Sequence, residues 1–310
     1  MRWTIGDGRV YDAPVRSYSL AVLIAVLGAV APQAVKPPFA PSRCQADPKW
    51  NDPAPPQHIF GNTWYVGTCG LSAILITSDK GHILIDGDTD KAPPLIEASI
   101  RKAGFRIKDV KLIVNSHAHN DHAGGIAKLQ RDSGAVVIAR GADVDALERG
   151  RGDRSDPQFL SITGFPRVAR VRRIADGEVV TLGPLAVPAH APPGHTPGST
   201  SFTWDSCEGT RCLHLAYAGS VSAISDDVYR FTDEAQHPGV VAAFRQGIAA
   251  IAAMPCDILL TPHPEASSLW LRMGAGASQP LVNANACREF AAKAGEQLDA
   301  RIAKERATAR

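Results

Sequence analysis

The feature that most constrains this chain is a cluster of metal-binding residue types directly after a short apolar segment. Lys111–Asn115 reads KLIVN, and the residues that follow it include His117, His119, Asp121 and His122. Imidazole nitrogens together with a carboxylate are donors that suit zinc. Burying these groups without a partner would cost free energy, because they are polar or charged. The pattern therefore predicts a metal site at the end of a strand rather than a solvated histidine-rich loop.

Two further histidines stand in proline-containing loops beside predicted strands. His195 lies in the segment PGHTPG, and His263 lies between two prolines just after the apolar run Asp257–Thr261. Function is often carried by loop residues at strand ends. We therefore expect His195 and His263 to complete the donor set, with His190 as the weaker competitor for the place of His195. The remaining histidines are interpreted as surface or structural residues: His58, His82, His214 and His237.

The pattern of apolar residues predicts alternating strands and helices in two halves. Strands are expected at Ile59–Val66, Leu71–Ser78, His82–Asp86, Lys111–Asn115, Ala135–Ala139, Glu178–Leu182, Leu185–Ala189, Ser199–Trp204, Leu213–Ala218 and Asp257–Thr261. Helices are expected at Pro93–Ala103, Gly125–Ser133, Val240–Ala253 and Cys287–Ala307. The polar stretch Gly150–Phe165 is expected to be a loop. Two strand-rich halves that each end in helices favour an α/β (α+β) fold, an αββα sandwich of two mixed sheets packed face to face.

The N-terminal region has the three-part pattern of a secretory signal peptide. Arg16 precedes the apolar run Leu20–Ala31, which ends in Ala-Val-Ala. The run is shorter than the roughly 20 residues that span a bilayer. We therefore expect a signal peptide in residues 1–34, with translation starting nearer Val15, and a single domain in residues 35–310. Export to the periplasm, without a membrane anchor after cleavage, is the expected outcome.

Composition and cysteine content agree with an exported globular protein. The chain has 310 residues, of which 33 are Lys or Arg and 31 are Asp or Glu, so its net charge of +2 argues against nucleic-acid binding. An exported protein can form disulfides, and six cysteines allow 15 pairings. The nearest-neighbour pairing is the simplest, and it joins Cys44 to Cys69, Cys207 to Cys212 and Cys256 to Cys287. Metal binding by cysteine is disfavoured because no CxxC pair occurs.

The histidine pattern resembles the signature of the metallo-β-lactamase superfamily, over nearly the whole predicted domain. The matching residues are His117-x-His119-x-Asp121-His122 with His195 and His263. The resemblance implies an αββα fold with two zinc ions. It assigns zinc site 1 to His117, His119 and His195, and zinc site 2 to Asp121, His122 and His263.

One position indicates the branch of this superfamily. Most of its hydrolases carry a metal-bridging aspartate where this chain has Ser220. The third subclass of class B β-lactamases instead carries serine there, with a second serine two residues later, as Ser222 is here. The subclass also has histidine as its first ligand, like His117, and the stretch Gly61–Gly70 is similar to it.

This resemblance implies an antibiotic-resistance enzyme. A zinc-bound hydroxide would open the β-lactam amide of penicillins, cephalosporins and carbapenems, and Asp121 would help to orient it. Ser220 and Ser222 would bind the substrate carboxylate, Gln158 would line the pocket mouth, and Asp86 is expected to tie the ligand loop by hydrogen bonds. The expected partner is a small β-lactam, and the expected oligomeric state is a monomer.

Two other functions compete with this interpretation. The first is another hydrolase of the superfamily, a lactonase or a glyoxalase II-like thioesterase, but Ser220 in place of a bridging carboxylate disfavours it. The second is a non-catalytic zinc-binding or carbohydrate-binding sandwich. Three protein ligands per zinc leave a coordination position open, which is typical of a catalytic site.

Overall fold

The computed structural model of this chain describes residues 44, 48–226, 228–274 and 276–308. The predicted signal peptide, residues 1–34, lies outside the described residues. In the described part of the chain, no helix is both long and apolar enough to cross a membrane.

The first half of the chain forms a seven-stranded mixed sheet. Its strands follow chain order: β1 (Gln57–Phe60), β2 (Thr63–Tyr65), β3 (Ile74–Ile76), β4 (His82–Ile85), β5 (Val110–Val114), β6 (Val136–Arg140) and β7 (Val171–Ile174). Neighbours from β1 to β4 pair antiparallel, and those from β4 to β7 pair parallel. The carboxyl ends of β4, β5 and β6 therefore lie at one edge of this sheet.

The second half forms a five-stranded sheet in the order β12-β11-β10-β9-β8. Its strands are β8 (Val179–Leu182), β9 (Leu185–His190), β10 (Ser201–Glu208), β11 (Arg211–Tyr217) and β12 (Ile258–Leu260). Only the pair β11 and β12 is parallel, and α5 lies between these two strands in the chain. This is the crossover connection that a parallel pair requires.

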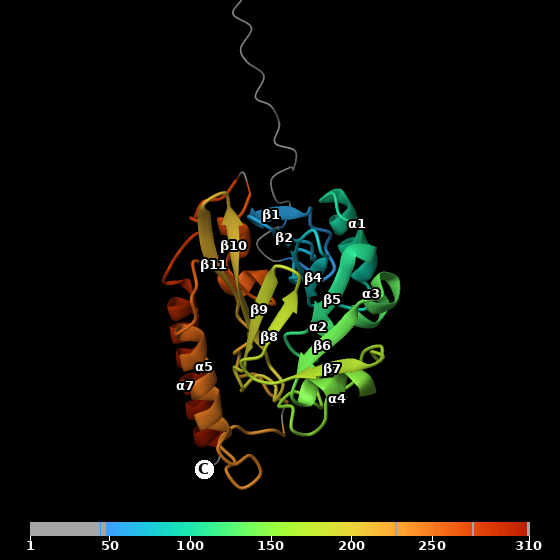
Figure 1. Cartoon of the computed structure of the whole chain (residues 1–310). Coiled ribbons are helices and arrows are strands. Elements are labelled where there is room, and N and C mark those ends of the chain that lie inside the picture. The colour runs from blue at the N-terminus through green and yellow to red at the C-terminus, as the bar shows by residue number, and fades with distance from the viewer. Residues whose placement is uncertain (1–43, 45–47, 227, 275, 309–310) are drawn as a thin grey trace, which may run out of the picture. The chain divides into compact units, whose positions relative to one another are not determined.

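Helices cover the outer face of each sheet (Figure 1). The first sheet is flanked by α1 (Pro93–Lys102), α3 (Ile126–Ser133) and α4 (Ala142–Arg149), and the second by α5 (Val240–Ala252) and α7 (Ala286–Thr308). Shorter elements are 3₁₀ turn η1 (Ile107–Asp109), α2 (Asn120–Ala123), 3₁₀ turn η2 (Pro264–Ser267) and α6 (Leu269–Arg272). The predicted αββα sandwich is confirmed.

Apolar side chains form one core between the sheets and one beneath each helical layer. Tyr65 and Phe202 both belong to the central core. Ile96 of α1 packs in the core outside the first sheet, while Phe244 of α5 and Leu298 of α7 share the core outside the second. Burial on both faces explains why strands such as β4 read as continuous apolar runs rather than alternating patterns.

The structure corrects three sequence-based expectations about elements. The predicted strand Ile59–Val66 is a hairpin of β1 and β2, since Gly61 and Asn62 lie between the two strands. Helix α4 was not predicted, because its buried face includes an aspartate, Asp143, which interrupts the apolar repeat that marks the equally short α3. Strand β7 was also missed, because its two middle residues, Arg172 and Arg173, are exposed and charged.

The three disulfides join the cysteines as the nearest-neighbour pairing proposed. Cys207 and Cys212 face each other across the β10–β11 hairpin. Cys256, just before β12, is bonded to Cys287 at the start of α7. This bond fixes the closing helix to the second sheet.

Candidate metal centre

The segment Ser116–His122, which we call the donor loop, begins after β5 and ends inside α2. Asp86, at the end of the neighbouring strand β4, holds its start. The carboxylate of Asp86 accepts hydrogen bonds from the backbone N–H and the hydroxyl of Ser116 at 2.7 and 2.6 Å, and from Asn115 Nδ2 at 3.0 Å. Tyr217 of the second sheet donates to the same carboxylate at 2.8 Å. The predicted structural role of Asp86 is confirmed.

Three buried histidines converge above the carboxyl ends of these strands. One possible ligand atom from each of His117, His119 and His195 lies within 4.8 Å of the others. Their rings are 4.8–5.0 Å apart between centroids. We call this group the first donor set.

The outer nitrogen of each ring in the first donor set has a hydrogen-bond partner. His117 Nδ1 donates to Ser116 Oγ at 3.1 Å, and His195 Nδ1 donates to the carbonyl oxygen of Ser222 at 3.0 Å. His119 Nε2 donates to Asp156 Oδ2 at 2.9 Å. These partners fix the tautomers and leave the other nitrogen of each ring with a lone pair for a metal.

Asp121, His122 and His263 form a second donor set beside the first. Asp121 Oδ2 lies 3.1 Å from His122 Nε2 and 3.3 Å from His263 Nε2, and the two nitrogens are 3.2 Å apart. A tetrahedral zinc with ligand distances of about 2.0–2.1 Å requires donor separations of about 3.3–3.4 Å. The donor atoms thus fit the group that the fold implies. The two donor sets lie next to each other, because ligand atoms of His117, Asp121 and His122 also lie within 4.8 Å of one another.

For three of these donors, His117, His195 and Asp121, the surroundings favour the protonation state that binds a metal. Burial, with the neighbouring His122 and His119, holds the pKa of His117 well below its usual value. Burial also lowers the pKa of His195, to about 3. For Asp121 burial alone acts in the opposite direction, but His122 and His263 hold its pKa below the usual range. Neutral imidazoles and an ionised carboxylate are the forms that bind a metal. For His122 burial acts to lower the pKa, but the Asp121 carboxylate raises it above its usual value, so a metal would displace a proton from this ring.

The loop that carries His195 depends on two glycines. Gly194 has a φ of +144°, and a Cβ there would lie 2.1 Å from the ring of Phe244 in α5. A Cβ on Gly198 would lie 2.1 Å from Asp143 Oδ1 of α4. Only a residue without a side chain fits both positions, so the loop can reach across from the second sheet to the donor loop.

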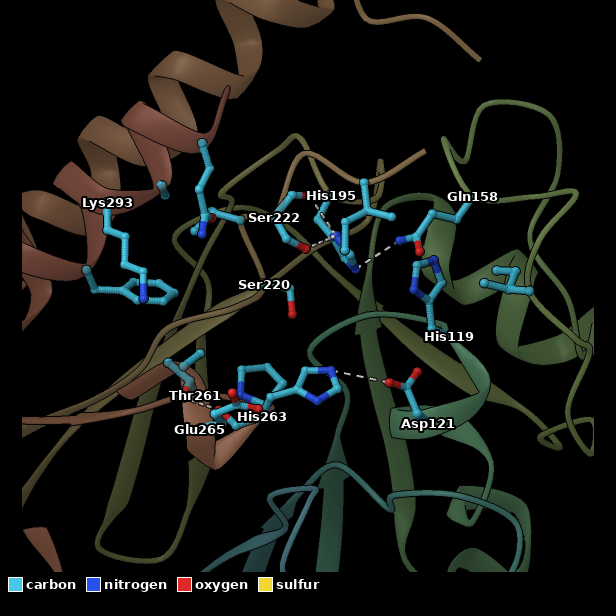
Figure 2. Close-up of a pocket in the computed structure, with 18 of the residues that line it drawn as sticks. His119, Asp121, Gln158, His195, Ser220, Ser222, Thr261, His263, Glu265 and Lys293 are labelled. Carbon is cyan, nitrogen blue, oxygen red and sulfur yellow. Dashed lines mark hydrogen bonds and ion pairs between the residues drawn. The ribbon is translucent and has the colours of Figure 1, made fainter. Parts of the chain in front are cut away.

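A cavity of about 600 Å³ opens beside both donor sets, and its lining includes His119, Asp121, His195 and His263. This volume is in the range of small-molecule sites. Figure 2 shows Ser220 between His195 and His263, with Lys293 extending from α7 on the far side.

The three predicted substrate-binding residues all line this cavity. Gln158 Nε2 lies 3.4 Å from His195 Nε2, at the first donor set. Ser222 Oγ lies 3.0 Å from His195 Nδ1, so it also helps to orient that ring. No carboxylate stands where Ser220 lies, as the sequence indicates.

The other histidines lie away from this group or serve the packing. His190 Nε2 pairs with Thr203 Oγ1 at 2.9 Å on the second sheet, so the competitor of His195 is excluded. His82 packs against Phe105, His237 stacks on Tyr229, and His214 pairs with Asp205.

Sequence reasoning missed several residues of the site. Asp156 contacts His119, and Trp50, Phe290 and Lys293 line the cavity. Phe290 and Lys293 are three residues apart on α7, which places them on one helical face. For Asp156 the available signal was its place two residues before Gln158, which the sequence analysis already assigned to the pocket mouth, whereas nothing around Trp50 pointed to the site.

Several known proteins are similar to this chain in both sequence and fold. The family model described as the metallo-beta-lactamase superfamily matches residues 66–209. The chain is 49% identical to the metallo-β-lactamase MIM-1 from Novosphingobium pentaromativorans, covering 84% of this chain and 94% of that one, with a TM-score of 0.80. It is 44% identical to MEM-A1, a subclass B3 metallo-β-lactamase from a soil metagenome library. The match covers 84% of this chain and 100% of MEM-A1, with a TM-score of 0.81. It is 45% identical to the Rm3 metallo-β-lactamase, over 83% of this chain and 97% of that one, with a TM-score of 0.80.

More distant relatives carry a different name. A hydroxyacylglutathione hydrolase of Anaeromyxobacter dehalogenans is 35% identical over 147 residues, which are 47% of this chain and 46% of the relative. That of Rhodopseudomonas palustris is 27% identical over 144 residues, or 45% of its length. The chain thus matches somewhat less than half the length of these two relatives.

Proposed function

The chain belongs to the metallo-β-lactamase superfamily, and we propose that it is a zinc-dependent β-lactamase that opens the amide bond of the β-lactam ring. The family and fold predicted from the sequence are thereby confirmed. The single observation that best supports the proposal is the pair of adjoining donor sets beside a cavity of substrate size, with Ser220 in place of a carboxylate.

Two zinc ions, one per donor set, are part of the proposal. His117, His119 and His195 would hold the first, and Asp121, His122 and His263 the second. Bound zinc supplies Lewis-acid chemistry, polarising a carbonyl oxygen and making water nucleophilic at neutral pH.

The side chains around the metal centre would position the reactants. The ionised Asp121 is placed to accept a hydrogen bond from the attacking water and so to orient it. The hydroxyl hydrogen of Ser222 stays available for the substrate carboxylate, because the His195 ring donates to Ser222 rather than accepting from it. Ser220 would be the second donor. Lys293 adds a positive charge on the opposite wall, and it has no ion-pair partner among the described residues.

The apolar part of the cavity wall would receive the substrate's ring substituents. Trp50, Ile162 and Phe290 line it together with Val221. We further propose that penicillins, cephalosporins and carbapenems are substrates, and that a monomer acts in the periplasm. The three disulfides support an oxidising compartment.

The test is hydrolysis of a chromogenic cephalosporin and a carbapenem by the purified chain, before and after removal of metal with EDTA. We expect hydrolysis that is lost on chelation and restored by zinc. Hydrolysis that persists unchanged after thorough chelation would contradict the zinc mechanism.

A thioesterase of the glyoxalase II type is the second candidate, since the chain is also similar to relatives named hydroxyacylglutathione hydrolase, over 147 and 144 residues. A glutathione thioester assayed beside the β-lactams separates the two candidates. Turnover of the thioester without turnover of any β-lactam would favour this alternative.

A further inference from the structure

The Asp156 carboxylate is buried directly beneath the first donor set. Its Oδ2 accepts a hydrogen bond from His119 Nε2 at 2.9 Å, and the two side chains are only 6% and 4% exposed. Asp156 stands in the long loop between α4 and β7, far from the donor loop in the sequence. Of the three rings in the first donor set, His119 is the one whose outer nitrogen meets a carboxylate.

This contact determines which nitrogen of His119 is free. With the proton held on Nε2 by Asp156, the lone pair lies on Nδ1, the atom left for the first donor set. A carboxylate partner also makes the imidazole a stronger donor, and such outer partners strongly affect metal affinity.

The second oxygen of the same carboxylate holds the cavity loop. Asp156 Oδ1 accepts the backbone N–H of Gln158 at 2.8 Å, and the Gln158 side chain reaches to 3.4 Å from His195 Nε2. Both oxygens of Asp156 are therefore occupied, one by a ligand ring and one by the loop that lines the cavity.

We propose that Asp156 is a positioning residue, which sets the tautomer of His119 and thereby the metal affinity of the first donor set, while it fixes the Gln158 loop against that set. The inference rests on the proposed metal binding, but not on the identity of the substrate.

Asp156→Asn disturbs at least one of the two contacts of the carboxylate with almost no change in shape. An amide has one acceptor oxygen and one NH₂ donor. If the oxygen stays with the Gln158 N–H, the NH₂ faces His119 Nε2 and drives the ring proton to Nδ1, the wrong atom. If the oxygen turns to His119, the NH₂ meets the Gln158 N–H, and the loop loses its anchor.

The chain offers a matched control in the same loop. Asp153 is 57% exposed, and its carboxylate accepts from Ser155 and Arg149 without touching a metal-donor ring. Asp153→Asn removes an equal charge three residues away, so it reports the effect of charge and of loop perturbation alone.

The measurement is zinc affinity of the purified full chain, from competition with a chromogenic chelator, together with the melting temperature of the metal-free protein. We expect Asp156→Asn to weaken the tighter zinc by about 10–100-fold, with Asp153→Asn unchanged. Unchanged zinc affinity in Asp156→Asn, or an equal loss in both variants, would overturn the proposal. Wild-type protein that binds no zinc would instead reject the proposed function.

A second measurement needs no variant. Long-range ¹H–¹⁵N spectra of the metal-free wild-type protein should show His119 protonated on Nε2, whereas Asp156→Asn should populate the Nδ1 form. A purely structural role of Asp156 would not move this signature. A wild-type His119 protonated on Nδ1 would overturn the proposal even if Asp156→Asn failed to fold.

Discussion

Each donor set takes two residues from the donor loop and one from the second half of the chain, but the surroundings of the two sets differ. In the first set, all three outer ring nitrogens have partners: Ser116, Asp156 and Ser222. In the second set, His122 Nδ1 is buried without a hydrogen-bond partner, and the His263 side chain is 36% exposed.

This difference in surroundings predicts that the two donor sets bind metal with unequal affinity. Oriented donors lose little freedom on binding a metal, so the first set should hold its ion more tightly. Both sets border the cavity, but His263 makes the second set the more exposed, so under the proposed function a more weakly held ion would meet the substrate there.

Removing one ligand from each set should separate them most clearly. We expect both His195→Ala and His263→Ala to lower kcat/KM by about 10³-fold or more, because metal stabilisation of the transition state is worth several kcal/mol. Each variant should retain about one zinc. Metal analysis during stepwise chelation should show the remaining zinc held more tightly in His263→Ala. An ion held equally firmly in His195→Ala would contradict the comparison.

Gly198→Ala should loosen the first set through packing. The new methyl group would overlap the buried Asp143 carboxylate, and overpacking of this kind costs about 1–3 kcal/mol. Denaturant unfolding measures the loss, and the chelator titration should show weaker zinc binding. Gly276→Ala is the control, since a Cβ there meets nothing within 4 Å, and it should change stability by less than about 0.5 kcal/mol.

Asp143 beneath the first set should make stability depend on pH. Burial raises its pKa to about 8, against the opposing effect of Arg140. Between about pH 4 and 8 the folded protein therefore holds a proton that the unfolded chain has released, so the free energy of unfolding falls as pH rises, by up to about 1.4 kcal/mol per pH unit.

Asp143→Asn should reduce this decline in the metal-free protein, because the amide is neutral throughout. Denaturant unfolding at several pH values measures the slope. Part of the decline in the free energy of unfolding should remain in this variant, because burial also raises the pKa of Asp88, to about 7. Asp145→Asn, at a 57% exposed position of the same helix, should leave the slope as it is. An unchanged slope in Asp143→Asn would show that Asp143 is ionised in the folded protein.

Gly295→Ala gives the smallest expected effect and lies away from both sets. The residue is inside α7, and a Cβ there meets nothing within 4 Å. Replacing a helical glycine by alanine should raise the free energy of unfolding by roughly 0.5–1 kcal/mol. Zinc affinity should not change, so any change in it would mean that α7 acts on the metal centre.

Much of the architecture could be predicted from local pattern. The donor loop after Lys111–Asn115 and the proline-flanked His263 are local features, as is the nearest-neighbour cysteine pairing. Continuous apolar runs marked the buried strands, because both faces of each sheet are covered. Strand β7 was missed because its arginines are exposed, and the β1–β2 hairpin because a two-residue turn hardly interrupts an apolar run.

The sequence by itself determined the chemistry of the donors, since residue type fixes which atoms can bind a metal and the spacing of His117 and His119 is local. Only the tertiary structure decided the partners. Asp156 reaches His119 from a loop 37 residues away, and Tyr217 reaches Asp86 across the two sheets. Such contacts arise when separate elements pack, and no local periodicity records them. The sequence therefore names the atoms that can hold the ions, while the packing of the two halves orients them.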